Sequence, residues 1–311
     1  MLFFLLKSGL ASVAMDHPNT RSLHSSPIPR TGGLAIMAGI AAAWIAARGN
    51  GLDLMWLLAC LLALLSFADD KYGLPVLGRM AAHIAAAGVF AWAYCPPDTA
   101  PWVGAAVILG MVWAINLYNF MDGADGLAGG MALFGFGFLG VAAWQADHAA
   151  LAWAGFSVAA TALAFLAFNF HPARLFMGDS GSVPLGFLAA AMGLSGWQQG
   201  AWPLWFPVLV FSPFGVDASV TLLKRMAAKK RFWQGHKEHY YQRLIALSGS
   251  QKRIVSGAYV LMAGAGISGL LGRAHGDWAV ILLLGWGVFY FSMMVIVDKR
   301  WADYLRGKHV D

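Results

Sequence analysis

Five of the 15 acidic residues in this chain stand at the ends of apolar runs or beside glycines. They are Asp69, Asp70, Asp122, Asp125 and Asp179. Ionisable groups at a membrane edge are energetically costly, and they usually indicate function. Carboxylates and amides at this density suit Mg²⁺, with Mn²⁺ as the alternative, rather than zinc. A cation held between carboxylates neutralises a diphosphate, so these residues predict phosphoryl transfer by positioning and charge stabilisation.

The longest such motif is NLYNFMDGADGLAGG, in which polar residues recur at every third position. Its members are Asn116, Asn119, Asp122 and Asp125. Neighbouring members share one face of a helix. The glycine that follows each aspartate is expected to end the helix, which lets both carboxylates turn inward.

Two further motifs carry the remaining acids. In FADD, Asp69 and Asp70 are adjacent, so on a helix they serve different partners, one a cation and the other a proton or a substrate. In NFHPARLFMGDSGS, Asp179 follows Gly178 at an expected helix start, where exposed N–H groups can hold phosphate and the carboxylate can hold a metal. Asn169 supplies an uncharged donor or acceptor for the same site.

Basic residues complement these acids. The loop 223–253 contains His236 and His239 among lysines and arginines, without the further ligands that a structural zinc site needs. We interpret it as a phosphate-facing basic pocket, with an interfacial helix on anionic lipid as the alternative. Arg30 adds a cationic group in an earlier loop.

The composition shows what must position these residues. Hydrophobic residues make up 59% of the 311 and charged residues 12%, about half the charged share of soluble domains. Segments of the length needed to cross a bilayer predict one all-α, polytopic membrane domain over 1–311. Ten spans are expected, at about 33–48, 52–68, 80–95, 101–119, 126–144, 149–168, 182–197, 202–222, 254–272 and 277–297. The apolar segment 1–15 would make an eleventh, so the expected count is ten or eleven.

The basic residues predict the orientation. Of the 21 lysines and arginines, all but Lys7, Arg48 and Arg273 fall in loops on one side, which is therefore expected to be cytoplasmic. The net charge of +6 is explained by this bias and does not indicate nucleic-acid binding. The five aspartates fall on the same side, so one substrate should come from the cytosol and the other from the bilayer. The expected cytoplasmic loops are 16–32, 69–79, 116–126, 169–181 and 223–253.

Taken together, these strings resemble the polyprenyl-phosphate N-acetylhexosamine-1-phosphate transferase superfamily, also called glycosyltransferase family 4. The resemblance runs from Asp16 to Leu244 and rests on DHPNTRSLHSSPIPRTGG, FADD, NLYNFMDGADGLAGG, FNFHPARLFMGDSGS and GHKEHYYQRL. It implies an Mg²⁺-dependent enzyme of the bacterial inner membrane. Such an enzyme would transfer a sugar phosphate from a UDP-N-acetylhexosamine to undecaprenyl phosphate and release UMP.

The resemblance also implies roles for the carboxylates. Asp69 would be the base that deprotonates the lipid phosphate, and Asp70 would help at the metal. Asp179 would be the main metal ligand, with Asp122 and Asp125 around the metal or the uracil. Direct attack by the lipid phosphate is favoured over a covalent aspartyl-phosphate, because a metal-bound carboxylate is a poor nucleophile.

The remaining expected residues contact substrate. His236 and His239 would face the diphosphate. The expected substrate-binding residues are Asn116, Asn119, Asn169, Arg30 and Gly178.

One departure narrows the resemblance. The branch that makes the first peptidoglycan lipid has three consecutive histidines where this chain reads His236-Lys237-Glu238-His239. That favours the branch that initiates O-antigen and other surface polysaccharides. Its sugars include N-acetylglucosamine, N-acetylfucosamine and N-acetylquinovosamine, and the chain looks most like the last two.

Two other classes fit less well. A multi-pass transporter would place acids near the midplane and often show an internal repeat. The acidic pattern of a CDP-alcohol phosphotransferase is absent from the sequence. The glycine- and aromatic-rich spans are compatible with a homodimer.

Overall fold

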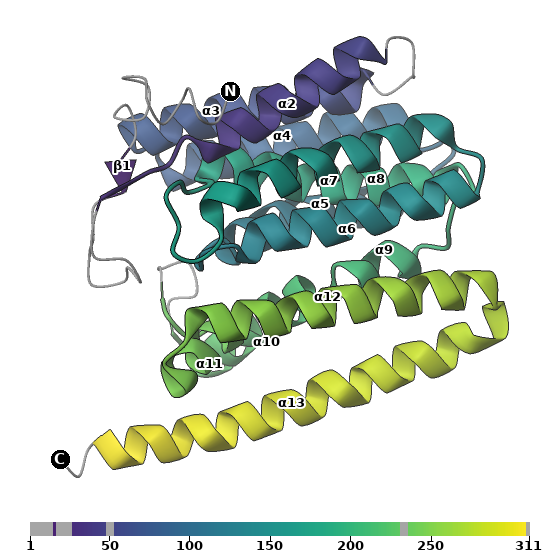
Figure 1. Ribbon diagram of the computed structural model, residues 1–311. Helices are drawn as coiled ribbons and strands as arrows, with labels where there is room; N and C mark the ends of the chain where they lie inside the picture. Colours follow the sequence, from purple (N-terminus) through teal and green to yellow (C-terminus); the bar gives the residue numbers. More distant parts are fainter. Residues whose placement is uncertain (1–14, 17–26, 48–52, 231–235, 309–311) are drawn as a thin grey trace.

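The computed structural model describes residues 15–16, 27–47, 53–230 and 236–308 (Figure 1). Within these residues the chain is nearly all helical, with twelve α-helices from α2 to α13, so the all-α prediction is confirmed. The expected apolar segment 1–15 lies outside the described residues except for Met15.

Nine helices coincide with predicted apolar runs to within a few residues at most ends. A run of apolar residues in lipid must satisfy its backbone polar groups internally, which a helix does. These helices are α2 (Gly32–Ala46), α3 (Asp53–Tyr72), α4 (Val76–Tyr94), α5 (Pro101–Phe120), α6 (Leu127–Gln145), α7 (Ala149–Asn169), α8 (Asp179–Gln198), α12 (Gln251–Ala274) and α13 (Ala279–Lys308).

Six segments of the described chain are long and apolar enough to cross a membrane, namely α4, α5, α6, α7, α12 and Gly276–Gly307, which contains α13. The chain is thus a multi-pass membrane protein, although fewer helices meet this measure than the ten or eleven expected. The helix α3 is less apolar because it ends in Asp69, Asp70 and Lys71. The helix α8 contains serines and glycines and is buried along its length, so it faces other helices rather than lipid.

The expected single span over 202–222 is wrong. The structure has α9 (Trp205–Val210) and α10 (Ser212–Ala227), separated at Phe211. Pro213 lies in the first turn of α10, where its missing N–H and its ring prevent α9 from continuing. The break lets α10 take its own direction towards the end of the molecule where the motifs lie.

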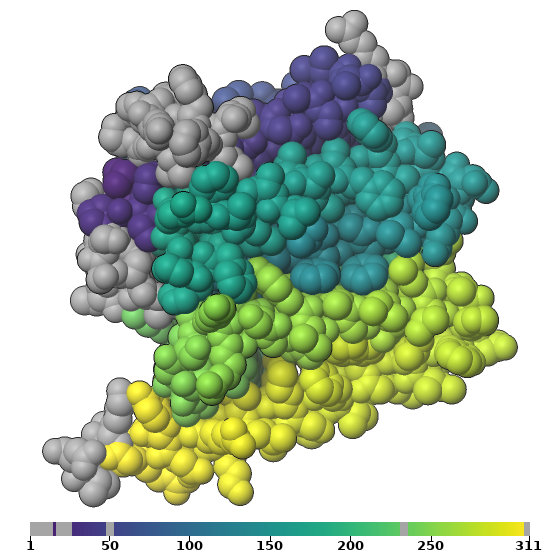
Figure 2. Space-filling view, in the orientation of Figure 1, coloured from purple at the N-terminus to yellow at the C-terminus, as the bar shows by residue number. Residues whose placement is uncertain are grey.

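The helices form a bundle in which α8 packs against α3 and α5, and α6 packs against α7 and α12. The last helix, α13, is an outer element beneath α12 (Figure 2). All the motif-bearing loops lie at one end of the bundle, at the left in Figure 1. We call this the site end.

At the site end, β1 (Met15–Asp16) pairs antiparallel with β2 (Ile28–Pro29). The carbonyl of Pro29 accepts a hydrogen bond from the N–H of Phe176 at 2.8 Å. The carbonyl of Phe176 in turn accepts one from the N–H of Gly32 at 2.9 Å. These bonds join the segment before α2 to the loop between α7 and α8.

The loops are shorter than expected, because the helices continue past the apolar runs into polar residues. Only 73–75 separate α3 from α4, 121–126 separate α5 from α6, and 170–178 separate α7 from α8. The expected loop 223–253 contains a helix of its own, α11 (Tyr240–Ser248).

Candidate active site

The end of α3 carries Asp69 and Asp70, and the two carboxylates bind different partners, as their adjacency predicts. Asp69 accepts hydrogen bonds from the N–H of Leu74 at 2.6 Å and from Arg79 at 2.8 Å. Gly73 has a φ of +67°, which turns the chain back toward the carboxylate. Asp69 therefore fixes the turn from α3 into α4.

Asp70 lies against the N-terminus of α8. The N–H of Ser180 donates to it at 3.2 Å, and the N–H of Asp179 lies 3.4 Å away. Gly178 has a φ of +69°, and a Cβ there would lie 2.8 Å from the Arg30 carbonyl and 2.9 Å from Asp70 Oδ2. Only glycine fits such an approach. The N–H groups at the start of α8, which are expected to hold phosphate, therefore face the carboxylate of Asp70.

Asp179 is the point where three helices meet. The side chain of Asn119, in the last turn of α5, forms a hydrogen bond with its carboxylate. Arg79 Nη1, from α4, lies 3.5 Å from Asp179 Oδ2 and 2.8 Å from Asp69 Oδ2, so one guanidinium bridges two carboxylates. Arg79 is absent from the expected site residues, because a lone arginine near a helix start carries no spacing signal.

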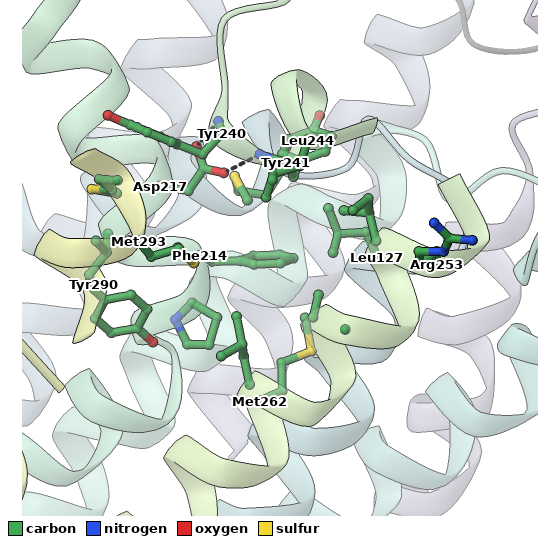
Figure 3. Close-up of a pocket in the computed structure, with 18 residues that line it drawn as sticks. Leu127, Phe214, Asp217, Tyr240, Tyr241, Leu244, Arg253, Met262, Tyr290 and Met293 are labelled. Atoms are coloured by element: carbon green, nitrogen blue, oxygen red, sulfur yellow. Dashed lines mark hydrogen bonds between the residues drawn. The ribbon is translucent and has the colours of Figure 1, made fainter. Parts of the chain in front are cut away.

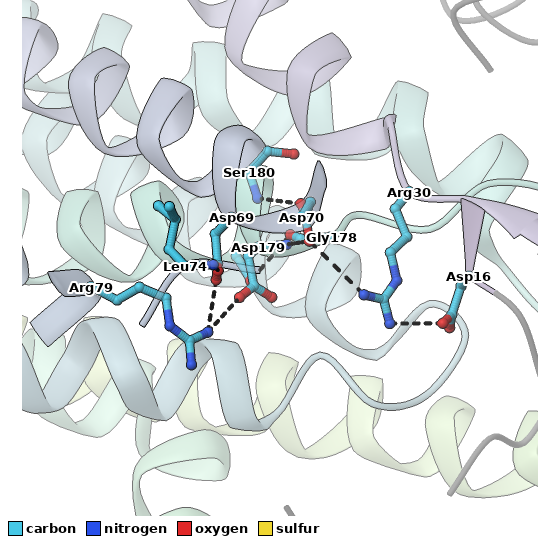
Figure 4. Close-up of polar contacts among 10 residues, drawn as sticks. Asp16, Arg30, Asp69, Asp70, Leu74, Arg79, Gly178, Asp179 and Ser180 are labelled. Carbon is cyan, nitrogen blue, oxygen red and sulfur yellow. Dashed lines mark hydrogen bonds and ion pairs between the residues drawn. The ribbon is translucent and has the colours of Figure 1, made fainter. Parts of the chain in front are cut away.

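Arg30 approaches from the other side, so that the aspartates lie between two arginines (Figure 4). Its Nη2 lies 2.8 Å from Asp16 Oδ1, and its Nη1 lies 3.9 Å from Asp70 Oδ1. The side chains of Arg30 and Arg79 are 39% and 36% exposed. Both guanidiniums are therefore accessible to a phosphate that enters from water, while their partners Asp69 and Asp70 are buried.

Asp122 lies in the loop between α5 and α6. Desolvation raises the pKa of Asp122 well above its usual range, and the nearby carboxylates of Asp179, Asp70 and Asp125 add to this against the opposing effect of Arg30. Several carboxylates therefore disfavour one another's charge here. A bound cation would relieve that repulsion.

The part of the chain that the structure describes contains no group of three His, Cys, Asp or Glu side chains able to hold a metal ion by themselves. The expected set of Asp70, Asp122 and Asp179 is therefore not assembled as a protein-only cage. Mg²⁺ commonly takes only one or two carboxylates and completes its shell with water and substrate phosphates. Asp122 and Asp179 fit that role, since Asp70 is engaged with the N-terminus of α8.

Asp125 and Asn169 tie loops together. Asp125 Oδ2 lies 2.7 Å from Nδ1 of His171 and accepts a hydrogen bond from the N–H of Ala173 at 3.1 Å. The buried Asn169 accepts the N–H of Gly126 at 2.9 Å and donates to the Leu175 carbonyl at 2.8 Å. Both expected residues thus lie at the site end, where they fix the loops that carry Asp122 and Asp179.

The segment that carries His236 and His239, which we call the histidine loop, is anchored by Asp217 of α10. This buried carboxylate accepts the N–H groups of Tyr240 and Tyr241, each at 2.9 Å, and lies 3.2 Å from Nδ1 of His239. His239 also caps α11. These contacts give Asp217 a structural role in holding the start of α11.

His236 stacks on His239, with ring centroids 4.9 Å apart. Desolvation, followed by the proximity of His239 and of Arg225, lowers the pKa of His236 to about 4. It is therefore neutral at pH 7 and able to accept a hydrogen bond. The adjacent Glu238 is paired with Arg225 at 2.7 Å and with Lys230 at 3.0 Å.

A cavity of about 420 Å³ adjoins the aspartates. Its polar part includes Asp69, Arg79, Asn116, Asn119 and Asp179, and Asn116 donates to its own helix at Val112 O. The rest of its lining is largely apolar and comes from α3, α4, α5, α8 and α10. Leu65, Val76, Met80, Leu109, Val112, Trp113, Val183 and Leu222 contribute to this part.

A second cavity, of about 250 Å³, lies behind the histidine loop (Figure 3). Asp217, Tyr240 and Tyr241 form one side, and Phe214, Met262 and Met293 are among its apolar lining. It is predominantly apolar, and none of the five aspartates lines it.

Comparison with known proteins finds one family that matches the central part of the chain. The sequence profile of glycosyl transferase family 4 matches residues 52–196, which include FADD, the NLYNFMDGADGLAGG motif and Asp179. Just under half of the chain therefore matches glycosyl transferase family 4. The matched segment contains all five aspartates, and Arg30 and the histidine loop lie outside it.

Curated relatives extend the likeness over nearly the whole chain. A probable undecaprenyl-phosphate N-acetylglucosaminyl 1-phosphate transferase of Bacillus subtilis is 26% identical over 87% of this chain and 80% of its own length. A decaprenyl-phosphate N-acetylglucosaminephosphotransferase of Mycobacterium tuberculosis is 29% identical over 96% and 86%. An undecaprenyl-phosphate α-N-acetylglucosaminyl 1-phosphate transferase of Yersinia pestis is 31% identical over 65% and 61%.

Proposed function

We propose that this chain transfers an N-acetylhexosamine-1-phosphate from a UDP-sugar to undecaprenyl phosphate, with release of UMP. The observation that carries the proposal is the junction at Asp179 of a carboxylate–arginine cluster with an apolar cavity. The carboxylate–arginine cluster suits a nucleotide sugar, and the apolar cavity suits a polyprenyl chain. The relatives' names, which give a polyprenyl phosphate and an N-acetylglucosamine phosphate group, support the proposal.

In the proposed reaction, an oxygen of the lipid phosphate attacks the phosphorus that carries the sugar. The bond from that phosphorus to the bridging oxygen breaks, and UMP leaves with the electron pair. Mg²⁺, held by Asp122 and Asp179, would neutralise the diphosphate. Arg30 and Arg79 are placed on opposite sides of the acids to bind phosphate oxygens.

Asp69 is the proposed acceptor for any proton on the lipid phosphate. Because Arg79 occupies one of its oxygens, proton transfer requires Arg79 first to turn toward the incoming phosphate. The arrival of the acceptor would thereby free the base that it needs. Direct attack remains our preferred mechanism, since Asp69 and Asp70 are engaged in hydrogen bonds and Asp122 and Asp179 are assigned to the cation.

We place the protein in the bacterial inner membrane with the site end in the cytoplasm, because most of the basic residues fall at this end. The His236-Lys237-Glu238-His239 sequence supports a role in starting O-antigen or other surface-polysaccharide synthesis. The proposed donors are UDP-N-acetylfucosamine, UDP-N-acetylquinovosamine and UDP-N-acetylglucosamine. A transporter would need acids along a path through the bilayer, whereas the five motif aspartates gather at one end.

The deciding experiment measures UMP release by the purified chain with Mg²⁺, undecaprenyl phosphate and each of these three donors. Lipid-dependent UMP from one donor would establish the reaction and the sugar together. Chelation with EDTA should stop release, and Mg²⁺ or Mn²⁺ should restore it. Folded protein that releases no UMP from any donor would contradict the proposal.

A further inference from the structure

His83 is a buried polar side chain to which the proposed reaction gives no role. It lies on α4, one helical turn beyond Arg79, so the two side chains share a face. The residue is 7% exposed and lines the 420 Å³ cavity. Within the described part of the chain, its Nδ1 has no hydrogen-bond partner. A buried ring nitrogen without a partner is costly.

The charged and amide side chains of this cavity, and the indole of Trp113, have partners within the protein. Asp69 is bonded to Leu74 and Arg79, and Asn116 and Trp113 donate to Val112 and Ser219. Asp179 is bonded to Asn119 and lies near Arg79. His83 differs from them because its Nδ1 has no hydrogen-bond partner among the described residues.

The lining indicates what enters the cavity. Val76 and Leu109 are 60% and 70% exposed on membrane-facing helices, so this side of the cavity opens toward lipid. A UDP-sugar is hydrophilic and would reach the site from water. An amphiphile with a phosphate head and an isoprenoid tail matches a cavity that has Arg79 and His83 at one part and aliphatic side chains at the other.

We infer that His83 hydrogen-bonds the phosphate of the polyprenyl phosphate acceptor and so selects it over the uncharged polyprenol. In this arrangement Arg79 and His83 hold the phosphate from successive turns of α4, and the first isoprene units lie against the aliphatic wall. The inference rests on the proposed function for the identity of the acceptor. It adds a residue that discriminates the phosphate group.

The test compares direct binding of undecaprenyl phosphate and of undecaprenol to the purified full chain, without a donor. The variants are His83→Leu, which removes both ring nitrogens, and His83→Gln, which retains a donor and an acceptor. The control is His275→Leu, an exposed histidine between α12 and α13, at the opposite end of the bundle.

We expect His83→Leu to weaken undecaprenyl phosphate binding about tenfold or more, the cost of a lost hydrogen bond to a charged group. Undecaprenol binding should be unchanged, His83→Gln should recover part of the loss, and His275→Leu should match the wild type. In turnover assays, the KM for undecaprenyl phosphate should rise in His83→Leu while the KM for the UDP-sugar stays within about twofold.

Two results would overturn the inference. Equal weakening of both lipids would assign His83 to packing alone, and unchanged binding of undecaprenyl phosphate would remove it from the acceptor site. Because binding is measured without turnover, a wild type that binds the lipid but releases no UMP would contradict the proposed function and leave the role of His83 intact.

Discussion

Arg79 Nη1 lies 2.8 Å from the Asp69 carboxylate, and the same atom is 3.5 Å from Asp179. One guanidinium therefore connects the turn after α3 with the start of α8. It holds together two carboxylates that would otherwise repel each other. The same group is exposed enough to move onto a substrate phosphate.

Replacing Arg79 should impair turnover far more than folding. We expect Arg79→Gln to lower kcat/KM about a hundredfold or more, because the positioned charge proposed to hold the acceptor phosphate is lost. Arg79→Lys should recover little, since a single ammonium cannot reproduce the planar fork. The measurement is UMP release at saturating UDP-sugar. Arg174→Gln is the matched control, because Arg174 lies at the same end and donates to a backbone carbonyl; an equal loss there would assign the effect to general electrostatics.

Asp179→Asn should abolish activity while the protein still inserts and folds. The substitution keeps the size and the hydrogen-bonding reach but removes the charge that we assign to the cation. Loss of about a hundredfold or more is expected. Asp147→Asn, between α6 and α7 at the other end, should be silent, because asparagine tolerates the φ of 59° there. Near-normal UMP release by Asp179→Asn would remove Asp179 from the metal site.

The sequence predicts most of the helices, because a membrane span needs only a run of apolar residues of the right length. It also predicts that Asp69, Asp70, Asp122, Asp125 and Asp179 meet at one end, since alternate helix ends in a bundle share a face. The break at Phe211 was missed because the residues on both sides are apolar. A hydropathy pattern cannot show that two consecutive helices change direction.

Individual contacts were not predictable in the same way. Arg79 and His171 contact Asp179 and Asp125, which lie far along the chain, and nothing in the sequence marks His83 as a buried side chain. Conversely, Asp125 and Asn169 each belong to one of the quoted motifs, yet their contacts fix loops. Residue type indicates the available chemistry, whereas the partner of each group depends on how the loops pack.

Asp122→Asn should make the apo protein more stable at neutral pH while it removes activity. The pKa of Asp122 is raised in the fold, so ionising this group costs folding free energy. Stability contributed by its protonated form is lost as pH rises through the folded pKa. The Tm of the variant should therefore exceed that of the wild type at high pH, and the difference should vanish at low pH. Thermal unfolding without divalent cations, from about pH 3, below the ordinary pKa of an aspartate, up to pH 8, tests this; a lower Tm for the variant throughout would contradict it.

His239 offers a way to separate capping from catalysis. Its side chain caps α11 and lies 3.2 Å from Asp217, so His239→Ala should lower both stability and UDP-sugar use. Asparagine is a favourable N-cap residue, so His239→Asn should restore much of the Tm. It should not restore turnover if the imidazole faces the diphosphate as proposed. Activity that returns in step with Tm would show that the ring serves only to hold α11, and the assignment of the diphosphate contact would then pass to His236 and the arginines.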